Sequence, residues 1–124
     1  MPCLTGDTFL GELPGQKQHL WVVLTSPNER GELAIANFST AARGWDTSCI
    51  VSPGEHPFVS RESCVRYSDA RLVECSHIEA AISKGLISRR EPVSNALLYR
   101  ILQGCLVSED TSPRIAKEVR RSLE

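Results

Sequence analysis

The pattern of apolar and polar positions changes character near residue 75. Before it, apolar residues occur in short runs between turns rich in Gly, Pro, Asn and Ser, which is typical of β-strands. The most apolar run, His19–Thr25, is rich in β-branched and aromatic residues, and we expect it to be buried on both faces. The run Glu32–Phe38 alternates instead, with Leu33 and Ile35 on one face, so the two runs predict a hairpin.

Shorter strands are expected on both sides of this hairpin. The sequence predicts them at Thr8–Leu10, Cys49–Val51, Cys64–Tyr67 and Ala70–Val73. The last two form either one strand or the two halves of a bent one. Strands this short, at spacings near ten residues, favour a small closed barrel or sandwich over residues ~5–75.

From Ser76 onward the pattern has a helical period. Ser76 and Glu79 match a capping box, and we expect the helix that they start to run to Lys84, with Gly85 after its end. This is the first of two to three helices predicted in residues 76–124.

Two further serines mark the later helices. Ser94 is expected to cap a helix over Asn95–Gln103 that ends before Gly104. Ser112 precedes a proline at the first helical position, which predicts a third helix over Pro113–Leu123. Strands followed by helices predict a single α+β domain over residues 1–124, with a β part (1–75) and a helical tail (76–124).

Composition narrows the functional classes. The 124 residues are 41% hydrophobic and 23% charged, as in globular domains, and the net charge of −1 gives no overall basic field for nucleic acid. No apolar run approaches the roughly 20 residues of a membrane helix, and the N-terminus has no signal-peptide pattern. We therefore expect a cytoplasmic protein that does not enter a membrane.

The five cysteines point to reduced thiols. They are odd in number and contain no C-x-x-C pair. The one close Cys–His pair, Cys75 and His77, lacks the usual spacing of zinc ligands, so we expect neither a metal site nor a cofactor.

Two loop residues could carry chemistry. His56 follows the Pro53-Gly54 turn, where an imidazole can act as a general acid or base; alternatively it is a surface histidine or one bonded to a nearby carbonyl. Arg61 can clamp a phosphate, or it can pair with neighbouring acids. Arg61, Arg66 and Arg71 are spaced by five, so in a regular strand Arg61 and Arg71 share a face and Arg66 points the other way unless a bulge intervenes.

Other candidates lie near the end of the third predicted strand. The hydroxyls of Ser39 and Thr40 can hold a phosphate or position a nucleophile, or they can cap a turn. Trp45 stands close to Arg43 in a polar loop, where it can stack on a base, anchor a protein partner or cover the mouth of the barrel.

Four stretches between Thr5 and Val73 together resemble the MazF/PemK family of toxin endoribonucleases. They are GDTFL, HLWVVLTSP, GELAIANFST and ESCVRYSDARLV. The resemblance implies an SH3-like β-barrel, usually a homodimer, that cleaves single-stranded RNA without metal and is held by an antitoxin-like protein partner. It assigns the family's catalytic hydroxyl to Ser39 or Thr40. The family's arginine before the second strand has no counterpart, because residues 16–19 are Gln, Lys, Gln and His and Leu20 replaces the family's proline.

In that reading, the ribose 2′-OH attacks the adjacent phosphate. His19 or His56 would serve as base or acid, and Lys17, Arg43 or Arg61 would supply positive charge. A non-catalytic barrel module that binds a protein or nucleic-acid partner is the alternative. A third hypothesis is a cysteine enzyme that uses Cys49 or Cys64 with His56; thiol alkylation would distinguish it from the other two.

Overall fold

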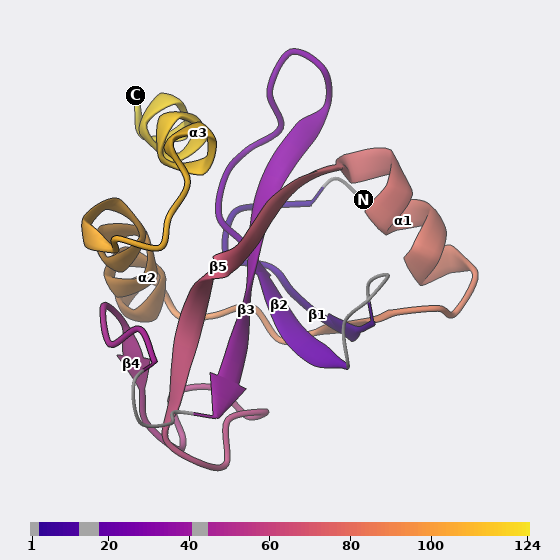
Figure 1. Cartoon of the computed structure of the whole chain (residues 1–124). Helices are drawn as coiled ribbons and strands as arrows, with labels where there is room; N and C mark the ends of the chain where they lie inside the picture. The colour runs from indigo at the N-terminus through magenta and orange to yellow at the C-terminus, as the bar shows by residue number, and fades with distance from the viewer. Residues whose placement is uncertain (1–2, 13–17, 41–44) are drawn as a thin grey trace.

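In the computed structural model, which describes residues 3–12, 18–40 and 45–124, a curled antiparallel sheet carries helices on both faces (Figure 1). The strands are β1 (Thr8–Gly11), β2 (His19–Val23), β3 (Glu32–Thr40), β4 (Ile50–Val51), β5 (Ser63–Glu74) and β6 (Ser88–Arg90). The helices are α1 (Cys75–Ser83), α2 (Asn95–Val107) and α3 (Pro113–Leu123). The strand order is β4-β5-β3-β2-β1-β6, in a sheet that curls into a half-barrel. This antiparallel sheet and the three helices confirm the α+β class.

The predicted hairpin is the centre of the sheet. β2 pairs with β3 in the register Leu20↔Phe38 to Val23↔Ile35. Alternate side chains of both strands enter two separate apolar clusters, so β2 is buried on both faces as its composition predicts.

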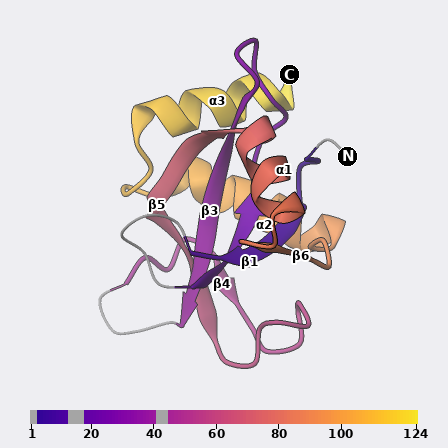
Figure 2. The ribbon, with the colours of Figure 1, turned by 90° about the vertical axis from the view of Figure 1, so that its right-hand side faces the viewer.

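Helices α2 and α3 cover one face of the sheet. The residues buried there, which we call the α2/α3 cluster, include Val22, Ala36, Val65, Tyr67, Leu97, Ile101 and Val119. Helix α1 covers the other face, in front of the sheet in Figure 2. Its α1 cluster consists of Cys3, Phe9, Trp21, Val23, Leu33, Ile35, Ile78 and Ile87.

Strand β5 is one long strand interrupted by a bulge. Ile35 of β3 pairs with Arg71, whereas Asn37 pairs with Arg66, so four residues of β5 lie opposite one of β3. Because Ile35 and Asn37 point to the same face, Arg66 and Arg71 also share it. The bulge thus aligns two arginines that a regular strand would place on opposite faces.

Two of the three helix caps predicted from the sequence are confirmed. The side chain of Ser94 accepts a hydrogen bond from Leu97 N, and that of Ser112 accepts one from Ile115 N. The capping box at Ser76 is wrong, because α1 begins at Cys75 with Glu74 in the cap position and no side-chain cap bond. Gly85 has φ +75°, which is the left-handed conformation expected after the end of a helix.

Gly104 lies inside α2 and does not end it. A Cβ atom there would lie 2.5 Å from the hydroxyl of Tyr67 and 2.9 Å from the carbonyl oxygen of Ser48. That hydroxyl donates a 2.7 Å hydrogen bond to Ile101 O. Glycine is therefore needed here because the helix packs closely against β5, and α2 continues to Val107.

The sequence did not predict β6, which pairs with β1 at the edge of the sheet. Thr8 lies opposite Arg90, and its hydroxyl donates a 2.7 Å hydrogen bond to Glu91 O. Arg89 lies 3.0 Å from a carboxylate oxygen of Asp7. All three residues of β6 are exposed, so the strand has no apolar pattern that would reveal it. Among the helices of the described residues, none combines the length and apolar character needed to cross a membrane.

Candidate functional site

A cleft of about 730 Å³ opens where β2 begins, β3 ends and β5 begins. The antiparallel registers bring these three strand ends to one edge of the sheet, since Leu20 faces Phe38 and Thr40 faces Ser63. We call it the strand-end cleft. Its lining is Gln18, His19, Leu20, Phe38, Ser39, Thr40, Trp45, Phe58, Val59, Ser60, Arg61, Ser63 and Arg66. The volume is within the range of small-ligand sites, about 300–1,000 Å³.

The strand-end cleft brings together most of the residues singled out from the sequence. His19, Ser39, Thr40, Trp45 and Arg61 all line it, although they come from two strand ends and two loops. Lys17 and Arg43 lie outside the described residues. His56 is described, but it does not line the cleft.

His19 is fixed in the strand-end cleft by a backbone carbonyl. Its Nδ1 lies 3.3 Å from Phe38 O, and because a carbonyl can only accept, Nδ1 carries the proton of this bond. In the neutral ring, Nε2 then holds the free lone pair. The ring meets that of Trp21 edge-on, with 6.4 Å between centroids, which limits its orientation further.

The two hydroxyl residues at the end of β3 differ in their surroundings. Ser39 is 8% exposed, and its Oγ has no hydrogen-bond partner among the described residues. A buried hydroxyl without a partner is unfavourable, so this Oγ would gain from a polar group that reached it. Thr40, the last residue of β3, is exposed to solvent at the same edge.

Aromatic rings and arginines form two pairs at the cleft. The guanidinium carbon of Arg66 lies 5.0 Å from the ring centroid of Trp45, and that of Arg90 lies 5.7 Å from that of Phe58. Trp45 is 36% exposed and Phe58 is 48% exposed, so both rings keep accessible surface. Such cation–π pairs hold a ring in place while leaving an edge or face to stack on a base.

Arg66 also lines the cleft, although sequence reasoning named it only as one of three evenly spaced arginines and not as a site residue. It lies 3.8 Å from Asp69, which also accepts a 3.1 Å hydrogen bond from the side-chain nitrogen of the fully buried Asn37. Through Asp69, the buried Asn37 thus helps to hold the side chain of Arg66 in position. The spacing of the arginines was a signal for it, but only the bulge in β5 places Arg66 on this face.

His56 has a structural environment. It is 2% exposed, its Nε2 is hydrogen-bonded to Glu91 O, and its Nδ1 accepts a 3.0 Å bond from Phe58 N. Both ring nitrogens are therefore engaged, in agreement with the alternative of a histidine bonded to a nearby carbonyl. The ring ties the loop after β4 to the segment after β6.

The thiols are poorly suited to nucleophilic chemistry. Burial raises the pKa values of Cys49, Cys64 and Cys105 above the ordinary value of a thiol, which disfavours the reactive thiolate. His56, the base of the cysteine hypothesis, has no free ring nitrogen. Within residues 3–12, 18–40 and 45–124, no group of three or more His, Cys, Asp or Glu side chains could hold a metal ion.

No model of a known protein family matches the chain, and no curated protein matches it.

Proposed function

We propose that the strand-end cleft binds single-stranded RNA and cleaves it without a metal ion. The observation that carries the proposal is the convergence of an oriented imidazole, an unpartnered buried hydroxyl and two arginines in one cleft beside two accessible rings. The sequence resemblance to MazF/PemK endoribonucleases supports it independently. The finer assignment of the half-barrel as SH3-like belongs to this proposal.

The proposed reaction is an internal transesterification. Nε2 of His19 takes the proton of the ribose 2′-OH, whose oxygen attacks the adjacent phosphorus, and the 5′-oxygen leaves with a proton from water. The products are a 2′,3′-cyclic phosphate and a 5′-hydroxyl. An imidazole suits this role because it exchanges protons readily at physiological pH.

The other cleft residues bind and orient the strand. Arg61 and Arg66 neutralise the charge that develops on the phosphate oxygens, and the hydroxyl of Ser39 or Thr40 donates a hydrogen bond to one of them. Trp45 and Phe58 stack on flanking bases, which is the usual way that proteins hold single-stranded nucleic acid. A homodimer, an antitoxin-like protein partner and a cytoplasmic location are part of the same proposal.

The decisive test is RNA cleavage by the purified protein in EDTA. We expect discrete fragments that end in a 2′,3′-cyclic phosphate, and a loss of rate of about 10²–10⁴-fold in His19→Ala, the usual contribution of a general base. His77→Ala is the matched control, because His77 is exposed on α1 and does not line the cleft. An unchanged rate in His19→Ala would remove the basis of the mechanism.

Binding is measured separately from cleavage by fluorescence anisotropy with a short RNA. We expect Trp45→Ala to weaken binding by about 5- to 150-fold, the range for loss of one stacked base. Arg66→Gln should lower the salt dependence of binding by about one phosphate contact.

A second candidate function is binding of single-stranded RNA without cleavage. It is favoured by one observation, namely that the arginine expected before β2 from the family resemblance has no counterpart among residues 16–19. Binding that requires Trp45 and Arg66, with no fragments from folded wild-type protein, would select this function. Absence of both binding and cleavage would overturn both proposals.

A further inference from the structure

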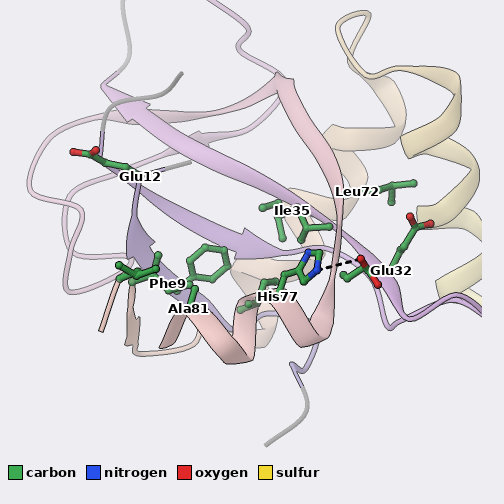
Figure 3. A pocket seen from close by; sticks show the side chains of 12 residues that line it. Phe9, Glu12, Glu32, Ile35, Leu72, His77 and Ala81 are labelled. Atoms are coloured by element: carbon green, nitrogen blue, oxygen red, sulfur yellow. Dashed lines mark ion pairs between the residues drawn. The ribbon is translucent and has the colours of Figure 1, made fainter. Parts of the chain in front are cut away.

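A second cavity lies between α1 and the sheet. It has a volume of about 400 Å³, and Figure 3 shows its lining. We call it the α1 pocket. None of its lining residues lines the strand-end cleft, so what it binds is independent of the proposed RNA chemistry.

The wall of the α1 pocket is largely apolar. It is formed by Phe9 of β1, Ile35 of β3, Leu72 and Val73 of β5, Ile78 and Ala81 of α1, and Leu86 and Ile87 before β6. Leu86 is 71% exposed, so it also presents apolar surface to solvent. Ala81 is the smallest side chain of α1 that faces the pocket, and its size leaves the space open. An apolar wall with a few polar groups is typical of small-molecule sites.

The polar groups of the lining are mainly acidic. They are Glu12, Glu32, Glu74 and His77, and the described lining contains no lysine or arginine. Figure 3 shows Glu12 at one end of the pocket and Glu32 at the other. Hydrogen bonds from Arg30 and Asn28 lower the pKa of the Glu32 carboxyl, and Arg30 forms an ion pair with it at 3.0 Å, so Glu32 stays ionised but its charge is partly balanced. His77 lies 3.3 Å from Glu74 at the exposed rim.

We propose that the α1 pocket binds a small molecule with an apolar body and a protonated amine. The apolar wall accepts the body, and the carboxylates at the ends of the pocket attract the positive charge. A neutral molecule of the same shape gains only the first contribution. A carboxylate of that shape is repelled by the glutamates.

Three probes with one apolar body test this order. They are 4-phenylbutylamine, 4-phenylbutan-1-ol and 4-phenylbutyrate, titrated into the full chain and followed by amide chemical shifts. We expect the amine to bind about two- to fivefold more tightly than the alcohol, the size of an ion pair at a partly exposed rim, and the carboxylate to bind most weakly. Shifts should centre on Ile35, Ile78 and Ala81.

Matched variants locate the site. Ala81→Leu fills the α1 pocket and should abolish binding of the amine, whereas Ala80→Leu, exposed on the same helix, should not change it. If Ala81→Leu does not fold, Glu12→Gln provides the test instead, because it leaves the apolar wall intact. It should reduce the difference in affinity between the amine and the alcohol. The matched control is Glu109→Gln, which is exposed far along the chain.

Three results would overturn the proposal. They are equal binding of amine and carboxylate, absence of binding of all three probes, and shifts that centre on His19 and Trp45 in the strand-end cleft. None of them bears on RNA cleavage, so this proposal and the proposed function fail separately.

Discussion

The substitution Gly104→Ala should destabilise the protein even though alanine is the better helix former. In an exposed helix this change adds about 1 kcal/mol of stability. Here the new Cβ would meet the Tyr67 hydroxyl at 2.5 Å, Ser48 O at 2.9 Å and the Cβ of Cys49 at 3.0 Å. Two of these neighbours are backbone or Cβ atoms, which cannot rotate away.

The expected size follows from two costs. Overpacking of a buried site costs about 1–3 kcal/mol. Displacing the Tyr67 hydroxyl from Ile101 O breaks a buried 2.7 Å hydrogen bond, which costs about another 1–3 kcal/mol when the buried hydroxyl is left without an acceptor. After subtraction of the gain in helix propensity, we expect a net loss of about 1–5 kcal/mol.

Urea unfolding, followed by circular dichroism and by the fluorescence of the fully buried Trp21, measures this loss. Tyr67→Phe is the partner variant, because it removes the oxygen nearest to the new Cβ. In that background Gly104→Ala should cost less, so the double-mutant cycle should show coupling between the two sites. An unchanged or higher free energy of unfolding for Gly104→Ala alone would refute the close approach of α2 to β5.

Two further predictions concern titrating groups. A hydrogen bond from Arg100 lowers the pKa of the Glu55 carboxyl, so this contact should stabilise the fold above the ordinary value of 4.5 and be lost as the pH falls through the lower folded value. Arg100→Gln should therefore be less stable than wild type at pH 7, with the gap closing in acid unfolding experiments; a constant gap would contradict this origin. With iodoacetamide at pH 8, half-buried Cys75 should react before the buried thiols with raised pKa values, Cys49, Cys64 and Cys105. Mass spectrometry of peptides checks the order, and early labelling of Cys105 would show that the α2/α3 cluster opens readily.

The parts of the fold that depend on local pattern were predictable from the sequence. The β2–β3 hairpin follows from the alternation of Leu33 and Ile35, and the starts of α2 and α3 follow from the caps at Ser94 and Ser112. The parts that depend on distant contacts were not. In the sequence, Gly104 looks like the residue after a helix end. The structure requires glycine there because Tyr67, 37 residues earlier in the sequence, approaches the helix closely (104 − 67 = 37).

The same division holds for the candidate site. His19, Ser39 and Thr40 could be found because antiparallel pairing brings the start of one strand next to the end of its neighbour. Arg66 could not be assigned to the site, since its face depends on a bulge that leaves no clear mark in the sequence. His56 looked like a loop imidazole because its partner, the carbonyl of Glu91, lies 35 residues away.

The pairing of β1 with β6 has a consequence for the order in which a growing chain can fold. β1 finds β2 within a few residues, but its other edge stays unpaired until Arg90, opposite Thr8, has been synthesised. Pairings of such long sequence separation form slowly because a large loop must close first. Until then, the nascent β part presents the backbone groups of β1 as a template for a strand from another chain. The short, polar β6 therefore covers the free edge of β1 only late in synthesis. A chain that stops before residue 88 would leave the backbone groups of this edge unpaired.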